Sequence, residues 1–417
     1  MSISRVRAIV LPLALAGCGA VMIGLAAQNG NSNPSAGAGG AQNPAAVAGS
    51  AGAQTPEFPN LPLWAYPVNP GRGGFGGRGA RGGANSGAGA NRGGPGGAAN
   101  PGAAAGAANS APGAANASAP SGGGNPAAGG RGPGRAPDDG TLRHVPGSDV
   151  GLTQTQMRSN GMFGFPDWFP GSHPGMPDIV LKGNSTSGVQ ACGYCHLPNG
   201  QGRPENESIV GLPAGYIVQQ LSDFKNGLRK GSDPRMGYFW MVRIGSAISD
   251  EDAWTAAKYF ASLKPKQWIR VVETDTVPVT RPAGGMLVAV DGGGTEPIGQ
   301  RVIVVSEDYE RTELRDPNSG FIAYVPKGSI ERGKELVTTG GNGKTIRCTI
   351  CHGPDLKGLG NVPSIAGRDP EQMGRQIIDI RNGVRNGPYT QLMKEPVRQL
   401  SDDDVVNIVA YLASLQP

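Results

Sequence analysis

Two pentapeptides decide the fold: Cys192-Gly193-Tyr194-Cys195-His196 and Cys348-Thr349-Ile350-Cys351-His352. Both have the pattern Cys-x-x-Cys-His, and together they use four of the chain's five cysteines and two of its four histidines. Residues at positions i, i+3 and i+4 lie on one face of a helical turn. Each motif is therefore expected to present two thiols and one imidazole side by side.

Two thiols and an adjacent imidazole at this spacing are the attachment signature of c-type haem. The thiols form thioethers with the haem, and His196 and His352 become the proximal iron ligands. The alternatives are two disulfides, which do not explain a histidine after both pairs, or zinc, which needs a fourth ligand at each motif. We expect two covalently attached haem c groups, held by Cys192, Cys195, Cys348 and Cys351.

The chain around the two motifs is duplicated. At the offset that separates the motif histidines, residues 220–229 (QLSDFKNGLR) match residues 376–385 (QIIDIRNGVR). Further along, Ser249 and Asp252 match Ser401 and Asp404, and both pairs have the spacing of a capping box. Each copy is expected to run helix, haem motif, loop, helix, ligand loop and final helix. Residues 329–337 are the expected opening helix of the second copy.

A methionine occupies the same position in both ligand loops. Met241 stands seven residues before Ile248, and Met393 stands seven residues before Leu400. A lone methionine is more often core filler, so the matched position is what favours Met241 and Met393 as sixth iron ligands. A thioether ligand raises the reduction potential and leaves no open coordination position.

Five other residues compete for this role. Met236 is the alternative in the first copy, and Met373 and Met286 are weaker alternatives elsewhere. His144 and His173 precede the first motif and would give bis-histidine ligation, although neither has a counterpart in the second copy.

These features resemble the bacterial class I cytochrome c fold, duplicated as in the di-haem c4 type. The resemblance covers residues 178–263 and 329–415 and implies an electron carrier of the bacterial periplasm. It implies that haem one is served by Cys192, Cys195, His196 and Met241, and haem two by Cys348, Cys351, His352 and Met393. Family members often have a proline whose carbonyl orients the proximal histidine. Pro363 fits this role in the second copy, whereas Glu207 occupies the matching position in the first.

The predicted fold is mainly α: two class I cytochrome c domains joined by a small β-containing insertion, after a long disordered tether rich in Gly, Ala and Pro. The expected boundaries are 1–27 for a signal peptide or anchor, 28–137 for the linker, 138–265 for the first domain with an N-terminal extension, 266–328 for the insertion and 329–417 for the second domain. Four β-like runs predict the insertion: residues 268–272, 286–290, 302–305 and 321–325.

The first 27 residues predict export. Arg5 and Arg7 precede an apolar run, as in a signal peptide. Three outcomes remain open: lipidation of Cys18, an uncleaved membrane anchor, or cleavage near Ala26. Each places the folded part in the periplasm or cell envelope, and the first two tether it to a membrane.

The linker carries the chain's positive charge. Residues 1–137 hold eight arginines and one carboxylate, whereas residues 138–417 hold 29 basic and 31 acidic side chains. The formal net charge of +5 therefore indicates neither a nucleic-acid partner nor anionic lipid for the folded part. Arg72, Arg78, Arg81 and Arg92 lie among glycines, for which a solvated linker is favoured over an RNA-binding segment. Three alternatives remain open for one apolar segment, residues 58–66. It docks on the folded part, it docks on a partner, or it is an isolated apolar patch without a role.

The predicted function is electron transfer with redox partners, either a dehydrogenase donor or an oxidase or reductase acceptor. One alternative is a di-haem peroxidase-like enzyme, which needs an open iron position at haem one. The other is an obligate haem subunit of an exported dehydrogenase, which co-purification would reveal.

Overall fold

The computed structural model describes residues 61–67, 139–158 and 162–417. The predictions for residues 1–27, Cys18 included, and for most of the linker lie outside these residues. Within the described part, no helix is both long enough and apolar enough to cross a membrane.

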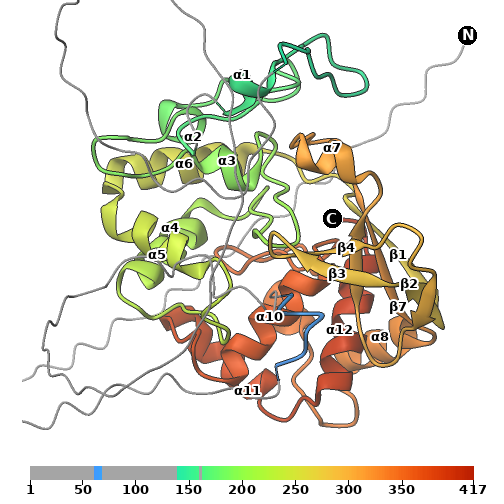
Figure 1. Ribbon diagram of the computed structural model, residues 1–417. Helices are drawn as coiled ribbons and strands as arrows, with labels where there is room; N and C mark the ends of the chain where they lie inside the picture. The colour runs from blue at the N-terminus through green and yellow to red at the C-terminus, as the bar shows by residue number, and fades with distance from the viewer. Residues whose placement is uncertain (1–60, 68–138, 159–161) are drawn as a thin grey trace, which may run out of the picture. The chain divides into compact units, whose positions relative to one another are not determined.

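The first half of the folded region is helical. Its elements are α1 (Gln154–Arg158), α2 (Asp178–Leu181), α3 (Cys192–His196), α4 (Ala214–Lys225), α5 (Tyr238–Ala247) and α6 (Asp250–Ser262). Helix α4 packs against α5 and α6 (Figure 1). An apolar cluster from residues 179–263 fills this half, and Phe260 and Leu212 are among its most buried members.

The insertion is built from short strands, and each of the four predicted runs overlaps one. The strands are β1 (Ile269–Thr274), β2 (Thr276–Pro278), β3 (Thr280–Ala283), β4 (Met286–Ala289), β5 (Thr295–Pro297), β6 (Ile303–Ser306) and β7 (Phe321–Pro326). Strands β1, β7 and β6 form one sheet, in which β1 runs parallel to β7 and β6 antiparallel. Strands β2 and β5 pair, as do β3 and β4. A short helix, α7 (Tyr309–Glu313), precedes β7.

The second half repeats the helical order of the first. It consists of α8 (Ser329–Thr339), α9 (Thr349–His352), α10 (Pro370–Arg381), the 3₁₀ turn η1 (Pro388–Thr390), α11 (Gln391–Val397) and α12 (Asp402–Ser414). Helix α8 contains the predicted opening helix and crosses α12 closely. A Cβ atom on Gly333 would lie 1.9 Å from the carbonyl oxygen of Asn407, so this crossing requires glycine.

The insertion and the second half share a core. One apolar cluster joins Ile269, Val304 and Phe321 of the strands to Val405 and Val409 of α12. The sheet is therefore packed on the second set of helices and is not a separate module.

Residues 61–67 dock on α10, which settles one alternative left open by the sequence (Figure 1, blue segment). Trp64, Ala65 and Tyr66 are buried in the same cluster as the second half. Arg375 Nη1 donates to the Ala65 carbonyl over 2.9 Å, and Tyr66 Oη donates to Asp379 Oδ1 over 2.8 Å. We call residues 61–67 the docked segment.

Candidate functional site

Each Cys-x-x-Cys-His motif folds as a single helical turn. The first motif is α3, and the second spans Cys348 and α9. In the second, the His352 amide donates to the Cys348 carbonyl over 3.0 Å, which closes the turn. The two thiols and the histidine of each motif therefore come from one turn, as the spacing predicts.

Both motif histidines are oriented by a backbone carbonyl. His196 Nδ1 lies 2.7 Å from the Glu207 oxygen, and His352 Nδ1 lies 2.8 Å from the Pro363 oxygen. A carbonyl only accepts, so Nδ1 carries the proton and Nε2 keeps its lone pair for a metal. A backbone carbonyl is enough to orient the histidine, and a proline is not required, because the Glu207 carbonyl accepts the same hydrogen bond in the first repeat.

Burial sets the protonation of the two imidazoles. It lowers the pKa of His196, although the Glu207 carbonyl opposes the shift, and it lowers the pKa of His352 in the same way. A metal binds the neutral imidazole, and a hydrogen bond to the other ring nitrogen fixes the tautomer that binds. Both histidines thus have the neutral form and the tautomer that a metal would bind.

The motif thiols are not assembled as a disulfide or a zinc site. The four cysteines are unpaired thiols, and burial raises the pKa of Cys192 to about 12 and that of Cys348 to about 11. Across residues 61–67, 139–158 and 162–417, no three His, Cys, Asp or Glu side chains form a group that could hold a metal ion. Two thiols and one oriented imidazole on each turn fit covalently attached haem.

The two matched methionines occupy similar surroundings. The prediction that they lie in loops is wrong, because Met241 lies on helix α5 and Met393 on helix α11. Met241 is partly buried against the apolar cluster of the first half. Met393 on α11 is partly buried against the cluster of the second half. Each lies in the half that contains the motif to which its position assigns it.

The competing ligands are placed differently. Met236 is buried in the cluster of the second half, together with Met286 and Met373. His173 uses both ring nitrogens, with Asp167 Oδ1 at 3.2 Å and the Pro174 carbonyl at 2.9 Å. His144 is exposed to solvent.

The two repeats pair through the turns that follow α4 and α10. Arg229 and Arg385 form an antiparallel bridge. Arg229 Nη2 donates to Gln376 Oε1 over 3.0 Å, and Arg385 Nη2 donates to Gln220 Oε1 over 3.1 Å. Each arginine also donates to the matching glutamine of its own repeat. These four residues lie in the repeat that the sequence reveals, but their pairing across the repeats was not predicted.

Glu207 adds a charge that only the first site has. Its carboxylate pairs with the buried Arg229. Burial alone would raise the pKa of Glu207, but Arg229 and Arg385 outweigh it and lower the pKa. The carboxylate therefore stays ionised on the same residue whose carbonyl, the counterpart of the Pro363 carbonyl, orients His196.

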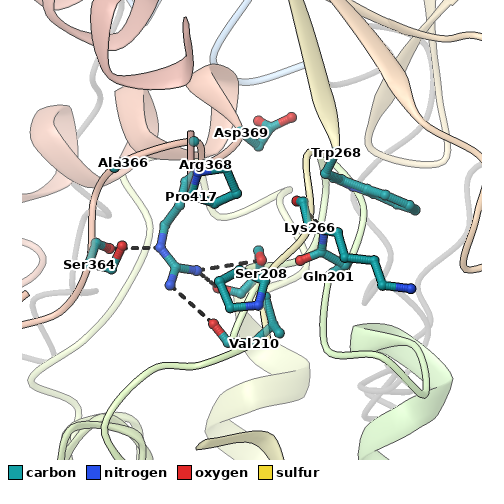
Figure 2. Close-up of a pocket in the computed structure, with 12 residues that line it drawn as sticks. Gln201, Ser208, Val210, Lys266, Trp268, Ser364, Ala366, Arg368, Asp369 and Pro417 are labelled. Atoms are coloured by element: carbon teal, nitrogen blue, oxygen red, sulfur yellow. Dashed lines mark hydrogen bonds between the residues drawn. The ribbon is translucent and has the colours of Figure 1, made fainter. Parts of the chain in front are cut away.

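Arg368 joins the two histidine-orienting loops (Figure 2). Its Nε donates to the Ser364 carbonyl over 2.7 Å, and its Nη1 donates to the Ser208 carbonyl over 2.7 Å. Ser208 and Ser364 directly follow Glu207 and Pro363, whose carbonyls hold the histidines. One sequence signal could have revealed Arg368: the two repeats differ at this position, where the first repeat has Leu212.

A family model described as cytochrome c matches residues 330–416. A thiosulfate dehydrogenase electron acceptor of Stutzerimonas stutzeri is 26% identical over 240 residues, which are 57% of this chain and 84% of that protein. A cytochrome c4 of Pseudomonas aeruginosa is 23% identical over 54% of this chain and 83% of its own length. Among solved structures, cytochrome c4 from Pseudomonas stutzeri is similar with a TM-score of 0.37 and 21% identity, covering 56% of this chain and 97% of that one.

A shorter relative gives higher identity. Cytochrome c-554(548) of Halomonas halodenitrificans is 35% identical over 75 residues, which are 18% of this chain and 90% of that protein. Together with the motif geometry and the family match, this places the chain in a known family. The protein belongs to the cytochrome c family.

Proposed function

We propose that the protein is a di-haem c-type cytochrome that transfers electrons in the bacterial cell envelope. One haem is attached to Cys192 and Cys195, the other to Cys348 and Cys351. The observation that carries the proposal is the matched pair of histidines, each held by a carbonyl at 2.7–2.8 Å with its Nε2 free. When bound, haem supplies one-electron redox chemistry, and the protein supplies ligands, burial and orientation.

The proposed axial pairs are His196 with Met241 and His352 with Met393. Met241 packs on the apolar cluster of the first half, whereas Met236 lies in the other cluster, and this contrast favours Met241. A bound thioether leaves no position open on the iron for a substrate. The chain is an electron carrier rather than an enzyme, as its cytochrome c4 and electron-acceptor relatives indicate.

The proposed organisation follows the sequence boundaries. Residues 1–27 export the chain or anchor it, residues 28–137 link it, and residues 138–265 and 329–417 carry haem one and haem two around the insertion at 266–328. The proposed partners are redox proteins of the same compartment. A sulfur-compound dehydrogenase is one candidate donor, because two relatives are named as thiosulfate dehydrogenase electron acceptors.

The test is the haem content of the purified full-length protein, read as a haemochrome spectrum against protein mass. We expect two covalent haems, and one haem in the double variant Cys348→Ser, Cys351→Ser. The reduced spectrum should not change with carbon monoxide. Fewer than two haems, or a carbon monoxide shift in about half of the haem, would overturn the proposal.

The axial methionines are tested separately. Met241→Ala and Met393→Ala should each open one iron to carbon monoxide, whereas Met236→Ala should open none. A shift in Met236→Ala with none in Met241→Ala would move the ligand assignment to Met236.

A further inference from the structure

The first haem motif is covered by two segments that have no counterpart around the second. Arg315, just after α7, stacks its guanidinium on the Tyr194 ring at 3.9 Å and also donates to the Tyr194 carbonyl. Phe165 of the N-terminal extension lies on Gly193, where an added Cβ would be 2.3 Å from the ring. The two central residues of the motif are therefore both under other parts of the chain.

Hydrogen bonds hold this cover in place. The Ala191 amide donates to the Met162 carbonyl over 2.9 Å, and Trp168 Nε1 of the extension donates to the Leu314 carbonyl over 2.7 Å. Asn199, just after the motif, donates to the Pro317 carbonyl over 2.8 Å. The extension, the segment after α7 and the first motif are thus tied to one another.

The second motif is open to solvent. Ile350 stands at the position of Tyr194 and is 56% exposed, and Cys351 is exposed. Ile346 and Leu359, on either side of the motif in the chain, are 44% and 64% exposed. Cys351 would hold the second haem through a thioether, and this attachment point is open to solvent.

The two motifs also differ in charge. Residues 341–362 contain the cations Lys344, Arg347 and Lys357, with Asp355 as the carboxylate. Lys344 pairs with Asp404 over 2.6 Å and Lys357 donates to the Pro417 oxygen over 2.8 Å, so within the described residues Arg347 is the cation of this stretch that is left for a partner. The matching residues 185–206 contain one arginine and one glutamate, a net charge of zero. Arg347 is exposed, and no ion pair within the described part of the chain involves it.

We propose that the protein exchanges electrons with its external partner at the second motif, through a docking face formed by Ile346, Ile350 and Leu359 with Arg347 beside them. The partner is a redox protein whose contact surface is apolar with carboxylates at its rim. Apolar contact excludes water at the centre of such an interface, and opposite charges at the rim steer the encounter. This inference rests on the proposed di-haem electron carrier.

The test reads binding and not electron flow. Isotope-labelled holoprotein is titrated with a small acidic cupredoxin whose copper has been replaced by redox-inert zinc, and amide shifts are followed by NMR at low salt. We expect shifts within residues 344–359, none within 191–203, and weakening of the binding by added salt. Shifts within 191–203, or no binding at low salt, would overturn the proposal.

Variants complete the test. Arg347→Glu should weaken binding of the probe by about tenfold, because it replaces attraction with repulsion at the rim. The matched control is Lys258→Glu on α6, an exposed lysine of the first half, which should leave the affinity unchanged. Equal weakening by both variants would show only the effect of net charge and would contradict a local face. The haem content of each variant is measured separately, so a failure of the carrier function is distinguishable from a failure of docking.

Discussion

Arg368 shows how one residue can affect both of the proposed haem sites. The Arg368 side chain is half-buried and pairs with no carboxylate in the described part of the chain; its partners are the carbonyls of Ser364, Ser208 and Val210. Burial lowers the pKa of Arg368, although the nearby Glu207 carboxylate opposes the shift. Hydrogen bonds from a charged donor are stronger than neutral ones. A single cation therefore fixes both loops whose carbonyls orient the histidines.

Replacing Arg368 by leucine, the residue of the first repeat, should change both haem potentials. The substitution frees the Ser208 and Ser364 loops and so loosens both histidine–carbonyl bonds, and such outer contacts tune a bound metal. It should also lower the free energy of unfolding by about 1–3 kcal/mol for buried carbonyls left unpaired. A spectroelectrochemical titration measures the potentials, with Arg368→Lys expected to restore them in part. Reduced stability with both potentials unchanged would leave Arg368 only a structural role.

At the scale of elements, the final helices α6 and α12 begin with the same residues but are capped unequally. Ser401 Oγ accepts from the Asp404 amide at 3.2 Å, and Asp404 Oδ2 accepts from the Ser401 amide at 2.7 Å. Ser249 accepts from the Asp252 amide at 3.1 Å, without the return bond. The sequence predicts two capping boxes, and the structure has one complete box and one simple N-cap.

The unequal caps predict unequal costs. Ser401→Ala should lower the free energy of unfolding by about 1–2 kcal/mol, whereas Ser249→Ala should cost about 0.5–1 kcal/mol, because the Ser401 hydroxyl also donates to Asp404 Oδ2 over 2.6 Å and the Ser249 hydroxyl only accepts from the Asp252 amide. Denaturant titrations of the two variants provide the measurement. Equal losses would mean that the hydrogen bond from the Ser401 hydroxyl to Asp404 contributes nothing.

Local patterns were sufficient for much of the fold. The two motifs, helix α8 and strands β1, β4, β6 and β7 each follow from spacing or alternation within a short window. Contacts between distant segments leave no such pattern. Neither the stacking of Arg315 on Tyr194 nor the docking of Tyr66 beside Asp379, 313 residues away, could be read from either segment alone.

At the scale of the whole molecule, Asp379 joins three distant segments. One of its carboxylate oxygens accepts from Tyr66 Oη at 2.8 Å and from the Ser232 amide at 2.7 Å. The other accepts from Tyr238 Oη at 2.8 Å. The docked segment, the stretch from Ser232 to Tyr238 of the first half and α10 of the second half therefore meet at one buried side chain.

The docked segment reverses the usual effect of a glycine substitution on α10. Glycine inside a helix is normally less stable than alanine by about 0.5–1 kcal/mol. A Cβ on Gly374, however, would lie 2.5 Å from the Trp64 ring, so Gly374→Ala should displace Trp64 and lower the free energy of unfolding. In a Trp64→Ala background the same substitution should stabilise the protein. Denaturant titrations of the four proteins give this double-mutant cycle, and additive effects would contradict the contact.

If the chain is anchored to a membrane as proposed, the docked segment also limits how far the proposed haem sites can lie from it. If residues 1–27 form the proposed anchor, the leash between anchor and protein is the 33 residues 28–60 and not the 110 residues 28–137. Whatever its conformation, a leash of 33 residues spans at most about 110–120 Å, against about 360–400 Å for 110 residues. The largest volume that the haem sites can sweep falls by about 40-fold. If Trp64 and Tyr66 left α10, the longer linker would restore the larger volume. Docking of residues 61–67 on α10 would then decide which membrane partners the protein can reach.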